Sequence, residues 1–224
     1  MLKRVLLVAG LLTLVAGTAS AQTPRFRITG LFGFTVADGV SGDAVPIGGA
    51  LYDRVDPTDG GNFGFSFGVM VDDHAELGFM YRRQMSSLEI SGPTAATINL
   101  GDFNLDSYHG YVSYYFGDPE AKVNPYVQFG LGATHATTFT FTRPVLGGQA
   151  TTNGGTQFSG VLGTGIQFNA ARNFGLKAGV SWTPTYIKSD AAGWWCDPWY
   201  GCYVVGNSQY ANQFHFEGGV VFRF

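Results

Sequence analysis

Hydrophobic and polar residues alternate with a period of two along much of this chain. In residues 214 to 224 (FHFEGGVVFRF), one parity carries mainly phenylalanine, while the other carries histidine, glutamate and arginine. The same alternation recurs in seven further segments, which begin near residues 25, 62, 75, 107, 125, 158 and 174. Such a period predicts β-strands with one apolar and one polar face. The chain is therefore expected to be all-β.

The connections between these segments alternate in length. The long connections span 38–61, 87–103, 136–155 and 188–208, and the short ones lie near 72–73, 117–124 and 169–173. An up-and-down outer-membrane barrel has this asymmetry, because its periplasmic turns are short and its outer loops are long. We expect an eight-stranded antiparallel up-and-down transmembrane β-barrel with four long outer loops.

The composition indicates which face of each strand points outward. A soluble eight-stranded barrel with an apolar pocket, as in lipocalins, would show the same alternation. Its outward face would have to be rich in charged residues. Here only 13% of residues are charged, 15% are aromatic and 33 of 224 are glycine, and the polar parity is mostly Gly, Ser and Gln. Small residues suit the narrow interior of eight strands, so the aromatic face is expected to meet lipid.

The first residues resemble a secretory signal peptide. Lys3 and Arg4 precede the apolar stretch 5–17, and Ala19-Ser20-Ala21 is a small-x-small cleavage site. We therefore divide the chain into a signal peptide, residues 1–21, and a barrel domain, residues 22–224. Removal of Lys3 and Arg4 leaves 11 of the 13 Lys and Arg residues against 16 Asp and Glu, a net charge of −5. This balance argues against a nucleic-acid partner, which requires a basic surface.

The last strand resembles the C-terminal signature of outer-membrane β-barrels, which ends in the pattern apolar-x-aromatic-x-Phe. With the segment PYVQFGLGAT at 125–134, the whole chain resembles the outer-membrane protein β-barrel family of small OmpA-like and OmpX-like barrels, without a peptidoglycan-binding domain. The resemblance implies the outer membrane of a Gram-negative-type bacterium and contact with outer-membrane lipids and lipopolysaccharide. It also implies that barrel-assembly machinery reads the last strand, through Phe216, Val220, Phe222 and Phe224.

The polar parity predicts a plug inside the barrel. Its residues are Arg27, Glu76, Arg82, His109, Gln128, Lys177, His215, Glu217 and Arg223. Charges in so confined a space must be paired or hydrated. Because cations outnumber carboxylates on this parity, we expect Glu76 and Glu217 each to bridge two cations. Arg83 is an exception on the lipid parity and is expected to extend toward the outer headgroups.

The fourth long connection contains both cysteines and many aromatic residues. In an exported chain, Cys196 and Cys202 are expected to form one disulfide. The surrounding aromatic residues are a candidate patch for binding an extracellular ligand, with packing on the disulfide or contact with lipopolysaccharide as alternatives: Trp194, Trp195, Trp199, Tyr200 and Tyr203.

These features favour a non-enzymatic role in envelope structure or in surface interaction through the long loops. We expect no catalytic residues and no cofactor, and none of the four histidines has a metal-ligand spacing such as H-E-x-x-H. One alternative is a narrow pore or a carrier of small apolar molecules. A second alternative is a lipid-modifying enzyme.

Overall fold

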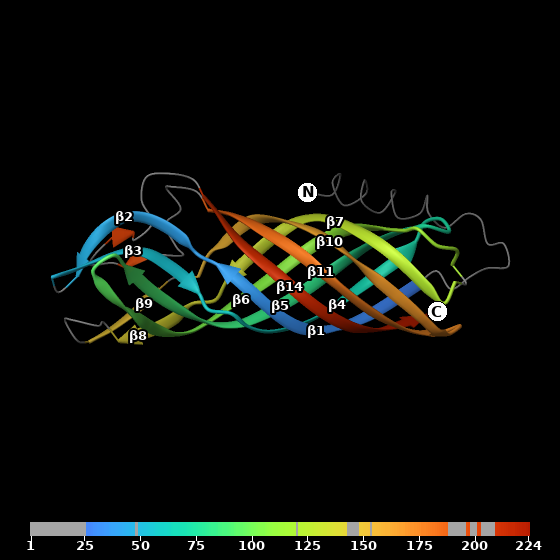
Figure 1. Ribbon diagram of the computed structural model, residues 1–224, viewed down its shortest axis with the longest axis horizontal. Helices are drawn as coiled ribbons and strands as arrows, with labels where there is room; N and C mark the ends of the chain where they lie inside the picture. The colour runs from blue at the N-terminus through green and yellow to red at the C-terminus, as the bar shows by residue number, and fades with distance from the viewer. Residues whose placement is uncertain are drawn as a thin grey trace, which may run out of the picture.

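Eight antiparallel strands close into a barrel in the computed structural model (Figure 1). The structure describes residues 26–47, 49–119, 121–142, 148–152, 154–187, 196–197, 201–202 and 209–224. No helix among these residues is long and apolar enough to cross a membrane. Around the barrel the strands follow one another as β1 (Phe26–Asp38), β4 (Gly60–Met70), β5 (Ala75–Gly92), β6 (Ala95–Tyr115), β7 (Val123–Ala136), β10 (Thr156–Ala171), β11 (Phe174–Ile187) and β14 (Gln209–Arg223).

The last strand closes the barrel against the first. The pairing of β14 with β1 runs from Arg27 opposite Arg223 to Asp38 opposite Asn212. At the end of the chain, the Phe26 amide donates to the Phe224 carbonyl at 3.2 Å, and the Phe224 amide donates back at 2.9 Å. The expected closure is confirmed, and it leaves β1 and β14 with partners along both edges.

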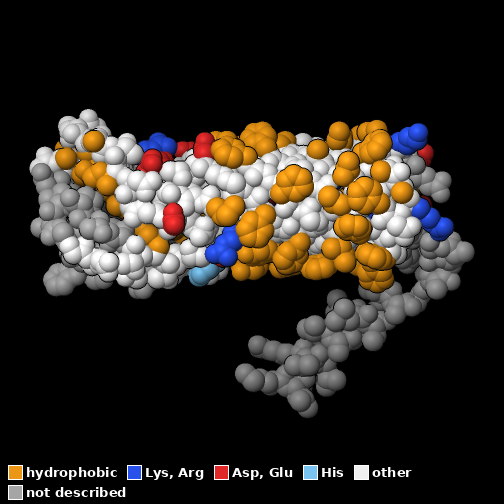
Figure 2. All heavy atoms as spheres, turned by 90° about the horizontal axis from the view of Figure 1, so that it is seen from below, with side chains coloured by type: hydrophobic (Ala, Val, Ile, Leu, Met, Phe, Trp, Pro, Cys, Tyr) orange, Lys and Arg blue, Asp and Glu red, His pale blue; other side chains and the backbone are white. Residues whose placement is uncertain are grey.

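The apolar parity points outward on all eight strands. On the face that Figure 2 shows, these side chains form a broad band over the part of the barrel that ends at the C-terminus. Every barrel strand contributes exposed Phe, Tyr, Trp, Leu, Ile or Val residues to this band, including Phe32, Phe67, Phe79, Val112, Phe129, Leu162, Leu176 and Phe216. The opposite parity is buried and mostly polar. The predicted orientation is therefore confirmed, with the apolar face on the outside.

The long outer connections contain β-strands among their described residues, which the alternation had not predicted. Segment 38–61 contains β2 (Val40–Ile47) and β3 (Ala50–Pro57), and 87–103 consists of the ends of β5 and β6, which pair as far as Gly92 opposite Ala95. The other two connections contain the hairpin of β8 (Phe139–Thr142) with β9 (Gln149–Thr152) and that of β12 (Cys196–Asp197) with β13 (Gly201–Cys202). In 87–103 the physical reason is register, because β5 and β6 are already paired in the barrel and continue to share hydrogen bonds beyond it.

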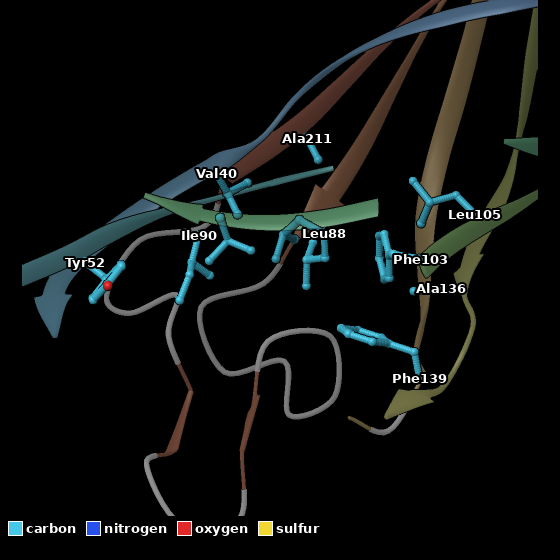
Figure 3. Packing of buried hydrophobic residues seen from close by; sticks show 11 residues of the cluster. Val40, Tyr52, Leu88, Ile90, Phe103, Leu105, Ala136, Phe139 and Ala211 are labelled. Atoms are coloured by element: carbon cyan, nitrogen blue, oxygen red, sulfur yellow. The ribbon is translucent and has the colours of Figure 1, made fainter. Parts of the chain in front are cut away.

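An apolar core fills the interior of this outer extension (Figure 3). In Figure 3 the labelled side chains point into one common space between the outer strands. The buried members are Val40, Tyr52, Val55, Leu88, Ile90, Phe103, Leu105, Ala136, Phe139, Ile187 and Ala211. On β5 the inward parity does not change, but its residues change from Arg82 and Gln84 to Leu88 and Ile90. The barrel is thus apolar outside and polar inside along its band, and apolar inside above it.

Candidate functional site

A buried ion pair between β5 and β14 crosses the centre of the lumen. The Nε and Nη2 atoms of Arg82 donate to the two Glu217 carboxylate oxygens at 2.6 and 2.7 Å. Arg82 also donates to the Ser181 hydroxyl at 3.1 Å, and only 2% of its side chain is exposed. Two parallel hydrogen bonds between a guanidinium and a carboxylate are the strongest geometry for such a pair. These two predicted lumen residues therefore neutralise each other across the barrel.

A second carboxylate, Glu76 on β5, is surrounded by one cation and two tyrosines. Arg27 Nη1 lies 3.2 Å from one Glu76 oxygen, and the Tyr115 hydroxyl donates to the same oxygen at 2.8 Å. The Tyr111 hydroxyl donates to the other oxygen at 2.5 Å. The Arg27 guanidinium also lies over the Tyr115 ring, 4.7 Å from its centroid. The carboxylate thus has the hydrogen-bond partners that a buried charge requires.

Glycine on the neighbouring strands makes room for this cluster. A Cβ atom at Gly68 would lie 2.2 Å from a Glu76 carboxylate oxygen, and one at Gly78 would lie 2.5 Å from the Tyr111 ring. Both distances are well below van der Waals contact. The glycines on the lumen parity of β4 and β5 are therefore needed by the side chains that reach across the barrel.

Direct ion pairs within 4 Å join each carboxylate to one cation, and Lys177 acts on Glu76 only through longer-range electrostatic attraction. Glu76 and Glu217 each contact one guanidinium among the described residues. Lys177 instead places its ammonium over the Tyr126 ring, 4.0 Å from the centroid, as a cation–π contact. Counting charges alone missed the tyrosines, which supply hydroxyl donors and ring faces without adding charge. Their inward parity was a usable signal, because Tyr115 shares the parity of His109 on β6.

The remaining predicted lumen residues lie in separate layers of the barrel. His109 Nε2 lies 2.9 Å from the Ser159 hydroxyl, and His215 Nδ1 lies 2.8 Å from the hydroxyl of Thr35. Gln128 is a half-buried residue near the central ion pair. Arg223 lies opposite Arg27 at the end of the barrel where the chain ends in Phe224, and its Nη2 donates to the carbonyls of Ala171 and Phe174.

The central layer leaves little free space. A cavity of about 20 Å³ lies beside the Arg82–Glu217 pair and the Lys177 ammonium, and Gln128 and Tyr126 also line it. A space of this size holds about one water molecule. The centre of the lumen is therefore filled by side chains, as expected for eight strands.

Buried polar side-chain atoms without a hydrogen-bond partner occur in two parts of the lumen. Within the described part of the chain, those toward the outer core belong to Asn62, Gln84, His109, Gln213 and His215, and those in the half near the C-terminus belong to Arg27, Ser113, Gln167 and Arg223. Each of these side chains is almost completely buried. Such groups are normally satisfied by internal water.

The expected disulfide lies in a hairpin of which the structure describes four residues. The backbone of β12 pairs with that of β13 so that Cys196 is directly opposite Cys202. Residues opposed in an antiparallel pair have Cα atoms about 4.5–5.5 Å apart, which is within the range that a disulfide requires. The disulfide remains a prediction. The predicted aromatic patch, Trp194, Trp195, Trp199, Tyr200 and Tyr203, lies outside the described residues.

The predicted assembly residues share the outward face of β14. Phe216, Phe222 and Phe224 are exposed there, and the terminal Phe224 side chain is 63% exposed. Val220 is half-buried on the same face. Recognition of these residues by assembly machinery remains a prediction.

Comparison with known proteins supports the same architecture. No curated protein matches the chain. Among solved structures, the outer membrane protein OprG of Pseudomonas aeruginosa is similar at 13% identity and a TM-score of 0.56, covering 91% of this chain and 98% of that one. Neisserial surface protein A is similar at 16% identity and a TM-score of 0.53, covering 89% and 97%. The outer membrane protease OmpT of Escherichia coli is similar at 9% identity and a TM-score of 0.51, covering 93% and 99%.

At these identities the structural likenesses show the fold alone, including the likeness to a protease. The family is shown by a separate finding, the model described as the outer membrane protein beta-barrel domain, which matches residues 6–224. That match covers every strand of the barrel and agrees with the closed antiparallel sheet and its apolar outer band. The chain therefore belongs to the family of outer membrane protein beta-barrel domains and is a protein of the Gram-negative outer membrane.

Proposed function

We propose that this protein is a non-enzymatic surface barrel, in which a sealed transmembrane part anchors a folded outer extension that interacts with other surfaces. The observation that carries this proposal is the apolar core above the lumen. Its buried residues come from the outer ends of β5, β6, β11 and β14 and from β2, β3, β7 and β8. A shared core holds these outer segments together as one body.

The lumen supports an anchoring role more than a conducting one. Arg82 and Glu217 are paired across its centre, and Glu76 is held by Arg27 and two tyrosines. Opening a path would break contacts between buried charges, and breaking one such pair costs about 3–5 kcal/mol. The cavity beside the pair has room for about one water.

The surface of the outer extension is acidic in the described residues. Its arginines are Arg54, which is paired with Asp38 and Asp56, and Arg83. The acidic residues on the same part of the chain are Asp38, Asp53, Asp56, Asp59, Glu89 and Asp102. An excess of one sign repels partners of that sign and attracts the other. The charge balance supports a partner surface that is basic.

Attachment of whole cells tests this proposal. A strain lacking the protein is complemented with the parent or with a variant carrying Asp53→Asn, Glu89→Gln and Asp102→Asn, and attachment to an amine-coated and an uncoated surface is measured. We expect the parent, and not the triple variant, to restore salt-sensitive attachment to the amine-coated surface. The control Lys177→Met changes only the lumen and should attach like the parent. Equal attachment by all strains would contradict a surface role.

Two further measurements separate the rival functions. Steady single-channel currents from purified protein in planar bilayers would favour a pore. A change in lipid A mass that depends on the protein would favour a lipid-modifying enzyme. We expect neither of these results. A carrier of small apolar molecules would take up an apolar fluorescent probe faster into vesicles that contain the barrel, and we expect no such difference.

A further inference from the structure

A groove runs along the outer wall of the barrel where the apolar band ends. Its volume is about 560 Å³, and it lies where the connection between β3 and β4 meets β5 and β6. Its apolar wall is formed by Phe63 and Met85, which are nearly half exposed on the lipid-facing parity. Its polar wall contains Asp59, Asp102 and Asn104. The volume falls in the range of ligand-binding sites in proteins.

A change of register produces this hollow. Asn62 of β4 is opposite Gln84 of β5, whereas Pro57 of β3 is opposite Leu88, which is one residue out of step. Between them the strand pairing is interrupted, and Thr58 donates its amide to the Ser87 carbonyl at 2.7 Å. Bulges of this kind bend a strand and re-aim its side chains. The interruption in strand pairing thus helps to form the groove, whose walls are side chains such as Phe63 and Met85.

Arg83 is the cation of this groove, and its hydrogen-bonding capacity is largely unused. Its nearest anionic atom is an Asp106 oxygen 3.6 Å from Nε, which is beyond hydrogen-bond distance. The same Asp106 oxygen already accepts from the Tyr81 hydroxyl at 2.8 Å. The Arg83 side chain is 35% exposed, and it donates no hydrogen bond to another described residue. Arg83 thus has one long ion pair, with Asp106, and its remaining donors can take a further anion.

The surroundings place this guanidinium at the level of lipid headgroups. Phe63, directly opposite Arg83, belongs to the lipid-facing band, while Asp102 and Asn104 lie on the polar side above it. Figure 2 shows a Lys or Arg side chain and a histidine at the place where the hydrophobic band gives way to polar residues. The groove therefore spans the boundary between acyl chains and headgroups, continuous with the established lipid-facing surface.

We propose that this groove is a specific site for one phosphorylated glycolipid of the outer leaflet. The phosphate lies at the Arg83 end, where the guanidinium can donate two hydrogen bonds to it. An acyl chain lies against Phe63 and Met85. The sugar hydroxyls donate to the carboxylates of Asp59 and Asp102, which would repel a phosphate placed at their end of the groove. One Asp59 oxygen already accepts the Ala37 amide at 3.0 Å, which fixes that carboxylate in place.

Native mass spectrometry of the intact barrel in detergent tests the site, with bisphosphorylated lipid A as the probe. We expect one molecule to bind tightly and Arg83→Gln to weaken this binding about tenfold, the effect of losing one charge-assisted contact. Arg54→Gln is the matched control, because Arg54 is an exposed arginine outside the groove. It should change the affinity less than about twofold, as surface ion pairs contribute little.

The phosphate and the sugar are tested separately. The parent should bind lipid A without phosphates about tenfold more weakly than bisphosphorylated lipid A. The affinity for this dephosphorylated probe should be the same in Arg83→Gln as in the parent, as expected if the phosphate and the guanidinium are in direct contact. Phosphatidic acid, which has a phosphate and acyl chains but no sugar, should bind more weakly than lipid A. Asp102→Asn should reduce that preference while the barrel remains folded.

Clear outcomes would overturn the proposal. Several lipid molecules bound with equal affinity would indicate ordinary annular lipid. Equal binding of the phosphorylated and dephosphorylated probes would exclude a phosphate site at Arg83. Arg83→Gln could fail to fold, in which case Asp102→Asn is the test. If that variant prefers lipid A over phosphatidic acid as strongly as the parent does, the sugar contact is refuted.

Discussion

Replacement of Glu217 by alanine should destabilise the barrel substantially. The change removes both carboxylate oxygens that accept from Arg82 at 2.6 and 2.7 Å and leaves the guanidinium of Arg82 buried. Breaking one partner of a buried ion pair costs about 3–5 kcal/mol, mostly because the other charge is left without compensation. The pair spans β5 and β14, which are not neighbours in the barrel. The lost contact therefore also removes a cross-link between distant strands.

Two features of the site place the expected loss at the lower end of this range. Arg82 keeps its contacts to the hydroxyls of Ser181 at 3.1 Å and Thr183 at 3.4 Å. The adjoining cavity of about 20 Å³ grows when the side chain is shortened, so water can reach the guanidinium. We therefore expect Glu217→Ala to lower the free energy of unfolding by about 3 kcal/mol.

Urea unfolding in lipid vesicles, followed by the gel mobility of folded and unfolded barrel, measures this loss. Glu89→Ala is the matched control, a carboxylate on the outer extension that should change stability by no more than about 0.5 kcal/mol. The double variant Arg82→Met with Glu217→Leu removes both charges. It should recover most of the lost stability, since apolar residues of similar volume often replace a buried pair without cost. A Glu217→Ala variant within about 0.5 kcal/mol of the parent would refute the ion-pair argument.

Four further outcomes are expected. Lys177→Met should destabilise less than Glu217→Ala in the same unfolding assay, because Lys177 contacts a ring face and its removal lowers the excess positive charge of the lumen. Deletion of Phe224, or its change to aspartate, should reduce the amount of folded barrel in outer-membrane fractions, and an unchanged yield would show that the terminal aromatic is not needed. Two backbone amides of its own turn donate to Asp72 and hold the pKa of its carboxyl below the usual value. The carboxylate should therefore stabilise the turn fully above the unfolded pKa near 3.8. This stabilisation should be lost as the pH falls through the lower folded pKa. A fall in the protection factors of the turn amides at low pH, relative to intrinsic exchange at the same pH, would confirm this, and Asp72→Asn should weaken the dependence. Thiol titration of unfolded, unreduced protein should find no free thiol if Cys196 and Cys202 are joined, and two free thiols would exclude the disulfide.

The outer extension illustrates why the same alternation has two meanings in one chain. Along the band, the solvent outside is lipid, so the exposed parity is apolar. Above the band, the surrounding solvent is water. The inward-facing positions there are apolar, and they pack together as Leu88, Ile90, Phe103 and Leu105. The residues between them, such as Glu89 and Asp102, face outward. The alternation is present in the sequence of 87–103, but its polar residues resemble a loop wherever the outward face is expected to meet lipid.

The sequence by itself determined the faces, the strand number and the closure of this barrel. A period of two assigns each residue to one of two sides, and the scarcity of charge in the strands decides which side meets lipid. The inward positions of Arg27, Glu76, Arg82, Lys177 and Glu217 follow from parity alone. In the structure the first four are buried, and Glu217 is paired with the buried Arg82. The aromatic terminal strand likewise indicated where the barrel closes.

Only the tertiary structure decided which of these residues meet. Parity places a side chain inside the lumen, but its height depends on the stagger between strands, which alternation does not encode. The pairing of Arg82 with Glu217, rather than Glu76 with two cations, depends on that stagger and on glycines that leave space opposite Tyr111. The groove beside Arg83 arises from a one-residue change in pairing between β3, β4 and β5. Both features depend on contacts between strands distant in sequence, which form only when the sheet closes.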